Sequence, residues 1–232
     1  VVKENKNSAA GNGVYANHAV KQFYFKDGAF SADGLSIKAT GKLGDKTKVF
    51  SLDEAQAEIT GNSTATAGKK AVKVAYTANG LTKAKGFNIY VAEKGAELAT
   101  ADEVIVAVNP EFSTATIGTK NSAGAYRFKT IQQAVDFLNG AGIKDGAEKK
   151  VYIAEGTYWE KLEITVPNVT LIGAGQDRTK IEYDSLYGVA DEGGFVHTTD
   201  STATLNVRDT AVGFEMRGVT VANKYNTLAS YN

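Results

Sequence analysis

The sequence predicts an all-β protein in two parts: a small β-sandwich, followed by a parallel β-solenoid that one helix covers at its N-terminal end. The first observation is a set of short strand-like segments, 162–165, 169–173 and 179–183, that follow one another almost without linkers. The second is the recurrence of such segments at 204–207 and 214–221, about forty residues later. Short strands that recur as a set are typical of a solenoid, in which each coil covers the apolar edge of the coil before it.

Composition limits the classes of function. The chain has 232 residues, with 26 Lys+Arg and 26 Asp+Glu, so its formal net charge is zero. This balance gives no electrostatic reason to expect nucleic acid or an anionic membrane as a partner. No apolar run is long enough to insert into a membrane, and the absence of cysteine excludes disulfides and thiolate chemistry.

The same features bear on where the protein acts. A secreted eukaryotic protein rich in β signals would usually contain cysteines, so we expect a bacterial protein that is extracellular or on the cell surface. The sequence starts without Met and without a signal peptide. We therefore expect it to be an internal or processed piece of a longer chain.

The first part of the chain carries turn-rich β signals. Residues 1–18 are small and polar, and we expect a linker or a disordered terminus there. Residues 19–93 form the predicted first domain, with Asn79-Gly80 as its strongest signal for a β-hairpin. Lysines such as Lys69, Lys70 and Lys73 are interpreted as a solvated sheet face. The expected strands are 20–25, 35–39, 48–52, 71–76 and 87–91.

The second predicted domain covers residues 102–232. Its first strand, 103–108, ends at Asn109-Pro110, because proline has no N–H to donate. A helix is expected over 130–139, where an apolar stripe recurs at helical spacing. Thr130 and Gln133 fit a capping box, and Gly140 suits the left-handed position after the helix. We expect this helix to cover the open edge of the first coil.

Stacked coils predict which strands pair. Segment 162–165 would lie against 204–207, and 169–173 against 217–223. Residues 184–200 form a longer excursion, which we expect to line the binding face. The last coil would leave an unpaired edge, so we expect self-association or a C-terminal fragment that completes the solenoid.

Segments of the first domain contain a recognisable strand pattern. Residues 68–76 have the pattern Gly-Lys-x-x-Val-x-Val-x-Tyr. Two other segments, 26–35 and 86–91, contribute to the same resemblance. These segments resemble bacterial immunoglobulin-like domains. The resemblance implies an immunoglobulin-like β-sandwich over 19–93 that acts as a spacer or a presentation module.

The second domain contains an ordered set of motifs. They are Phe-x-Thr-Ile-x-x-Ala-Val at 128–135, Ile-x-x-Gly-x-Tyr-x-Glu at 153–160, Leu-x-Gly and Thr-x-Ile within 171–181, an Ala-Thr strand at 202–207, and Gly-Phe followed by Thr-x-x-Asn within 213–223. This set resembles the N-terminal half of a pectinesterase (pectin methylesterase) catalytic domain. The resemblance implies a right-handed parallel β-helix and an enzyme that hydrolyses the methyl esters of pectin (polygalacturonate) to pectate and methanol, without a cofactor.

The resemblance implies one aspartate as nucleophile, a second as acid/base, and glutamines that hold the oxyanion. The family motifs with these residues follow the Thr-x-x-Asn strand and are not present here. We therefore assign no catalytic residue and predict that this chain alone is inactive. Gln176-Asp177 is similar to the Gln-Asp-Thr motif of the family. It comes directly before the Thr-x-Ile segment, however, and the resemblance places a turn there. Thr204 matches a family residue that borders the substrate, which makes it a candidate substrate-binding residue; the alternative is a stacking residue in a strand ladder.

Other candidate residues carry weaker signals. His18 and His197 lie in different domains, and the acidic residues Asp184, Asp191, Glu192 and Asp200 match no known calcium loop, so we expect no metal site. Tyr158, Trp159 and Tyr187 could stack on sugar rings, but packing against the helix explains the first two better. The alternative to an enzyme is a non-catalytic surface or fibre protein that uses both modules for assembly or adhesion. A pectate lyase would require an acidic calcium cluster, which the sequence does not show.

Overall fold

The structure is a computed structural model that describes residues 2–4, 8–10, 14–16, 21–32, 35–43, 46–52, 54–188 and 198–225. Within these residues most elements are β-strands, and helix α1 (Ile131–Gly140) is the one helix longer than a single turn. This agrees with the all-β class predicted from the sequence. In the same ranges, no helix has the length and apolar character that crossing a membrane requires.

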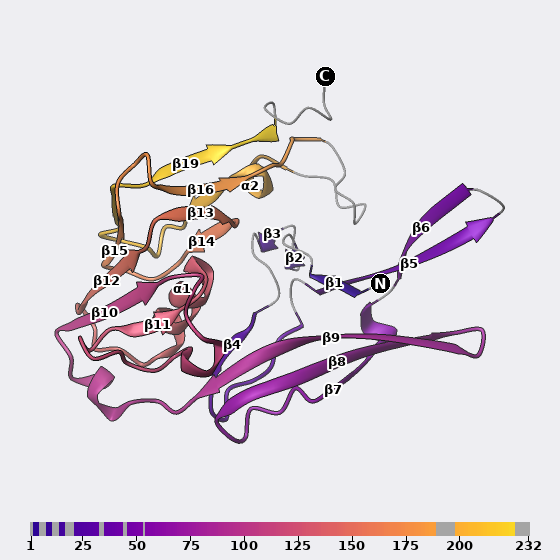
Figure 1. Ribbon diagram of the computed structural model, residues 1–232, viewed down its shortest axis with the longest axis horizontal. Coiled ribbons are helices and arrows are strands. Elements are labelled where there is room, and N and C mark those ends of the chain that lie inside the picture. Colours follow the sequence, from indigo (N-terminus) through magenta and orange to yellow (C-terminus); the bar gives the residue numbers. More distant parts are fainter. Residues whose placement is uncertain are drawn as a thin grey trace.

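The N-terminal half consists of two sheets and a small hairpin (Figure 1). The three-stranded sheet has the order β1 (Val2–Glu4), β5 (Leu35–Leu43) and β6 (Lys46–Leu52). The four-stranded sheet has the order β4 (Phe23–Phe25), β9 (Leu81–Ala92), β8 (Gly68–Ala78) and β7 (Glu58–Thr60). The hairpin joins β2 (Ser8–Ala10) to β3 (Val14–Ala16), so strands occur within residues 1–18, where the sequence carries no strand signal.

Side chains from the two sheets share a small apolar core. Leu35 and Ile37 of β5 form one buried cluster with Val74 of β8. Strands β8 and β9 pair along their whole length around Asn79-Gly80, whose φ angles are 49° and 74°. Two successive positive φ angles match the twist of a two-residue hairpin, and they confirm the predicted turn.

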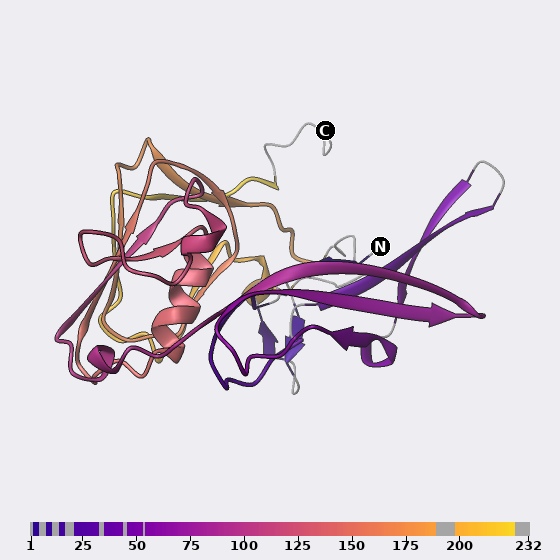
Figure 2. The same cartoon turned by 60° about the horizontal axis from the view of Figure 1, so that its bottom comes forward.

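The C-terminal half consists of parallel strands in three ladders (Figures 1 and 2). The first ladder runs β11 (Tyr126–Phe128), β10 (Glu103–Val108), β12 (Glu148–Ile153), β15 (Val169–Gly173) and β18 (Glu215–Arg217). The second runs β13 (Gly156–Trp159), β16 (Thr179–Tyr183) and β19 (Thr220–Asn223), and the third pairs β14 (Leu162–Ile164) with β17 (Leu205–Val207). The chain visits the ladders in the same order twice, with the short helix α2 (Thr199–Thr202) before β17.

The pairing register tests the predicted stacking. Leu162 lies opposite Leu205 in parallel strands, as predicted. The second predicted pair is wrong: 169–173 lies against Glu215–Arg217, and Thr220–Asn223 lies against β16 instead. The cause is a corner at Gly218, where φ is +63°, so 214–221 makes two strands on two ladders. A Cβ at the facing Gly173 would lie 2.3 Å from the carbonyl oxygen of Gly218, so the corner is closely packed.

The last strands are less covered than those beneath them. Leu162 and Leu171 are fully buried, whereas Val207 is 43% and Met216 is 37% exposed. Met216 lies directly opposite Leu171. The self-association or completing fragment expected from this edge stays a prediction.

Helix α1 begins as predicted and ends differently. Its apolar stripe is buried, and the Thr130 hydroxyl accepts a hydrogen bond from the Gln133 N–H at 3.2 Å. The Gln133 side chain accepts a hydrogen bond from the Lys129 N–H at 3.3 Å, whereas a capping box would have it accept from the Thr130 N–H. One of the two predicted capping hydrogen bonds is therefore present, and the other has a different donor. The left-handed position after the helix is Gly142, with φ of 65°, and not Gly140, which is the last helical residue.

The helix covers the edge of β14 that does not face β17. The Gln132 side-chain amide imitates a neighbouring strand: its oxygen accepts from the Glu163 N–H at 3.0 Å, and its nitrogen donates to the Glu163 carbonyl at 3.5 Å. The Glu160 carboxylate accepts from the backbone N–H groups of Ile131 and Gln132 at 3.1 and 3.0 Å. These contacts show that the helix covers the free edge of β14, while its role as the cap of a β-solenoid stays a prediction.

An aromatic cluster joins the N-terminal four-stranded sheet to this helix. Phe137 of α1 has ring centroids within 4.6–5.7 Å of four other rings, those of Phe23, Phe25, Tyr126 and Phe128. Phe23 and Phe25 belong to β4, and they share one continuous buried core with the interior of the parallel ladders. The two halves of the chain are therefore packed together and not merely linked.

Candidate functional site

The carboxyl ends of β13, β16 and β19 bring polar and aromatic side chains to one edge of the second ladder. Parallel pairing places Trp159 opposite Glu182, and Tyr183 opposite Asn223. Figure 1 shows the three strands one above another with their ends on the side of α2. We call Trp159, Lys161, Tyr183, Ser185 and Asn223 the edge site.

Two aromatic rings form the exposed part of the edge site. The Trp159 side chain is 42% exposed, and its ring centroid lies 5.6 Å from that of Tyr183 at an interplanar angle of 45°. Neighbouring Tyr158 points the other way: it is buried, and its hydroxyl donates to the Ala154 carbonyl at 3.0 Å. Burial, followed by the charge of Glu160, raises the pKa of Tyr158 to about 12. Both residues were expected to pack against the helix: Tyr158 is buried in the cluster that includes the apolar stripe of α1, whereas Trp159 is partly exposed and packs on Tyr183.

Lys161 lies beneath Tyr183. Its ammonium nitrogen is 5.2 Å from the centroid of the Tyr183 ring, and it donates a hydrogen bond to the Ser201 carbonyl. The side chain is only 3% exposed. A cation at this distance is attracted to the face of an aromatic ring, so Lys161 helps to hold the orientation of Tyr183.

A side-chain clamp forms the polar part of the edge site. The Asn223 amide nitrogen donates to the Ser185 carbonyl at 2.8 Å, and the Ser185 N–H donates to the Asn223 amide oxygen at 3.4 Å. The Ser185 hydroxyl oxygen is buried and has no hydrogen-bond partner among the described residues. Glu182, beside the clamp, pairs with Lys224 at 3.6 Å. The clamp fixes the chain where it leaves β16.

Thr204, the predicted substrate-binding residue, lies directly behind this edge. It is 5% exposed, and its hydroxyl donates to the Ala222 carbonyl at 3.1 Å. Its own carbonyl accepts from the Leu162 N–H at 2.9 Å. In this structure Thr204 connects β17 to β19, and contact with a ligand stays a prediction.

Other residues considered from the sequence lie elsewhere. Gln176 and Asp177 are in the turn between β15 and β16, where the Gln176 carbonyl accepts from the Thr220 hydroxyl at 2.7 Å. His18, His197, Asp191 and Glu192 fall outside the described residues. In the ranges that the structure covers, no three His, Cys, Asp or Glu side chains converge in a way that would hold a metal ion.

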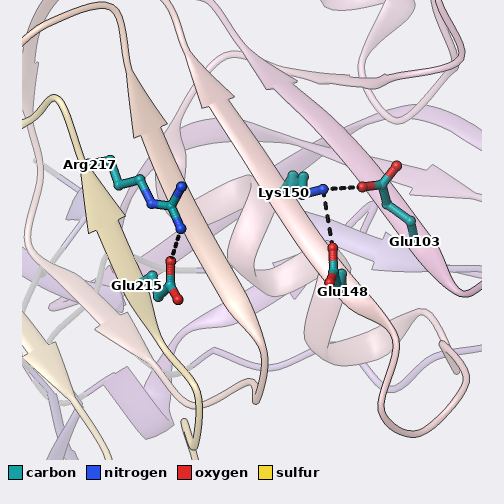
Figure 3. Close-up of polar contacts among 5 residues, drawn as sticks. All are labelled: Glu103, Glu148, Lys150, Glu215 and Arg217. Carbon is teal, nitrogen blue, oxygen red and sulfur yellow. Dashed lines mark hydrogen bonds and ion pairs between the residues drawn. The ribbon is translucent and has the colours of Figure 1, made fainter.

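The outer face of the first ladder is charged but internally paired (Figure 3). The Lys150 ammonium contacts the carboxylates of Glu103 and Glu148, the latter at 3.1 Å, and Arg217 pairs with Glu215 on β18. The hydrogen bonds that the Lys150 ammonium donates to Glu103 and Glu148 raise the pKa of Lys150 above its usual value. Because these charges compensate one another at an exposed surface, they do not mark a binding site.

Comparison with known proteins gives two similar sequences. Both come from Arabidopsis thaliana: "Probable pectinesterase/pectinesterase inhibitor 17" is 36% identical over 100 residues, and "Probable pectinesterase 29" is 30% identical over 108 residues. The matches cover 43% and 46% of this chain, but only 17% and 28% of the relatives. The chain thus spans less than a third of either relative. No family model matches the chain.

Proposed function

We propose that this chain is the first part of the catalytic region of a pectinesterase that hydrolyses the methyl esters of polygalacturonate to pectate and methanol. The similarity to two proteins named as pectinesterases is the observation that carries the proposal. In this proposal the three parallel ladders are the first coils of a right-handed parallel β-helix, and the N-terminal sheets form an immunoglobulin-like spacer. Since pectin is an extracellular polymer, the parent protein would act outside the cell.

The edge site is the part of the chain that we assign to the polymer. Pyranose rings present faces of C–H groups, which pack well on aromatic rings, and Trp159 and Tyr183 offer such rings at a partly exposed edge. The amide of Asn223 adds hydrogen-bonding groups beside them. Thr204 would support this edge by holding the Ala222 carbonyl of β19.

The chemistry of ester hydrolysis needs more than the edge site contains. An ionised carboxylate must attack the ester, a second group must transfer the proton, and donors must hold the oxyanion. At the edge site the Glu182 carboxylate is held by Lys224, and we assign no nucleophile among the described residues. We therefore propose that catalysis requires the parent polypeptide.

Methanol release tests the proposed activity. The parent polypeptide is expected to release methanol from methyl-esterified polygalacturonate, while the 232-residue chain alone is expected to release none, because we assign neither a nucleophile nor an acid/base pair among its described residues. Methanol is measured with a coupled alcohol-oxidase assay. A parent that releases no methanol would favour the non-catalytic role in assembly or adhesion, and turnover by this chain alone would show that the active site is misplaced.

Replacing Trp159 with alanine tests the edge site. We expect the affinity for methyl-esterified oligogalacturonide to fall about tenfold, which corresponds to about 1.4 kcal/mol, because one stacking ring is lost. Isothermal titration with the full chain measures this. Tyr152→Ala is the matched control, since Tyr152 is 46% exposed but lies on the first ladder. Equal losses for the two variants would exclude a specific role for Trp159.

A further inference from the structure

The charged residues of the β8–β9 hairpin are all of one sign. Residues 68–92 contain Lys69, Lys70, Lys73, Lys83 and Lys85, and no Asp or Glu. The hairpin therefore carries a formal charge of five, whereas the whole chain has a net charge of zero. Five like charges on one hairpin create a positive potential that attracts a partner of opposite charge.

The lysines of the hairpin are not neutralised within the described residues. All of them are exposed except Lys70, which is half-buried and donates to the Thr66 hydroxyl at 2.6 Å. Among the described residues, lysines that form ion pairs lie elsewhere and include Lys26, Lys120, Lys144, Lys150 and Lys224. The hairpin thus presents positive charge that the rest of the described chain does not compensate.

The strand register divides these charges between the two faces of the hairpin, with Lys70, Lys83 and Lys85 on one face and Lys69 and Lys73 on the other. Lys83 and Lys85 lie opposite Tyr76 and Val74, so both point to the same face, about 7 Å apart along the strand. The Thr77 and Thr82 hydroxyls bond across the strands at 2.7 Å, next to the Asn79-Gly80 turn. Figure 1 shows the tip of the hairpin at the end of the molecule opposite the parallel ladders.

On the opposite face, the neighbours of Lys73 are small. Lys73 lies opposite Gly86, and Ala75 lies opposite Ala84, so the Lys73 side chain is not covered from across the strands. A lysine ammonium group binds an anion as a point charge, whereas the planar guanidinium of arginine binds a phosphate through two parallel hydrogen bonds. Residues 68–92 contain no arginine, the side chain that binds phosphate in a bidentate manner, so an extended polymer with spaced carboxylates fits this hairpin better than a nucleic acid.

We propose that this basic hairpin binds de-esterified polyuronate, the acidic polysaccharide that the proposed reaction produces. The choice of polyanion rests on the proposed function. In ester hydrolysis, water adds to the ester carbonyl, the C–OCH3 bond breaks, methanol leaves, and the new carboxylic acid ionises by releasing a proton. Each turnover therefore adds one negative charge to the polymer, and the hairpin holds the protein on the region that has been hydrolysed.

The test compares two polymers and two variants of the full 232-residue chain. Wild type is expected to bind de-esterified polygalacturonate at low ionic strength, and to bind the same polymer in fully methyl-esterified form at least about tenfold more weakly. K83Q/K85Q is expected to lose about tenfold in affinity for the de-esterified polymer. K26Q/K144Q removes the same formal charge from two exposed ion pairs and is expected to bind like wild type. Binding is measured by biolayer interferometry, with the denaturation midpoint confirming that each variant is folded.

Several results would overturn the proposal. They are equal binding of the esterified and de-esterified polymers, unchanged binding by K83Q/K85Q, and tighter binding to duplex RNA or to phosphatidylserine vesicles than to polygalacturonate. The outcome is separable from the methanol assay. Loss of hairpin binding beside an active parent would reject only this inference, and lysine-dependent binding beside an inactive parent would support it while rejecting the esterase.

Discussion

Replacing Phe137 with alanine is expected to lower the free energy of unfolding by about 3–5 kcal/mol. The side chain is 1% exposed, and it packs between the rings of β4 and those of β11, so its loss leaves a cavity between the two halves of the chain. Denaturant unfolding, followed by tryptophan fluorescence and by far-ultraviolet circular dichroism, measures the change. Because the cluster joins both halves, we expect the two signals to shift together.

Two further variants separate packing from coupling. Phe137→Leu keeps most of the volume and is expected to cost less than half as much as the alanine variant. A double-mutant cycle of Phe23→Ala with Phe137→Ala is expected to give a coupling energy of about 0.5–1.5 kcal/mol, as for aromatic pairs in contact. A coupling energy of zero would mean that β4 does not rest on the helix.

Features with a strong local signal are those for which sequence and structure agree. The Asn79-Gly80 hairpin depends on two residues that accept positive φ, and helix α1 depends on an apolar stripe and the Thr130 hydroxyl. The pairing of Leu162 with Leu205 followed from the recurrence of similar strands. Each of these signals is a matter of a few neighbouring residues or of a simple repeat.

The allocation of strands to ladders depended on a single backbone angle. Residues 214–221 have the pattern of one strand, and only the positive φ of Gly218 divides them between the first and second ladders. A glycine is compatible with a strand, a bulge or a corner, so the pattern alone does not decide. The prediction therefore placed residues 217–223 against β15, whereas the strand that pairs with β15 is β18.

The edge site was largely beyond the reach of sequence patterns. Tyr158 and Trp159 are adjacent, and strand alternation sends one inward and the other outward; the register of Tyr158 with buried Ile181 decides which. The clamp between Ser185 and Asn223 connects residues 38 apart in the sequence, so no local sequence motif predicts it. Only the stacking of β16 and β19 brings these residues together.

Replacing Glu160 with alanine is expected to lower the free energy of unfolding by about 2 kcal/mol. Its carboxylate accepts hydrogen bonds from the N–H groups of Ile131 and Gln132, which have no partners within helix α1. A negative charge at this end also interacts favourably with the helix dipole. The variant therefore leaves two backbone donors unpaired, one of them on fully buried Ile131, and removes a charge that stabilises the helix. Chemical denaturation at neutral pH measures the effect.

Glu160 holds the helix against the corner between β13 and β14, so its substitution also tests how the edge of β14 is covered. Glu160→Gln keeps one acceptor oxygen but no charge, and it is expected to lose about half as much stability as Glu160→Ala. Glu155→Ala is the matched control, because that exposed carboxylate is 3.7 Å from Arg178 and contributes little. If Glu160→Ala and Glu155→Ala unfold at the same denaturant concentration, the carboxylate does not stabilise the helix. The cover of β14 would then depend on Gln132 and apolar packing alone.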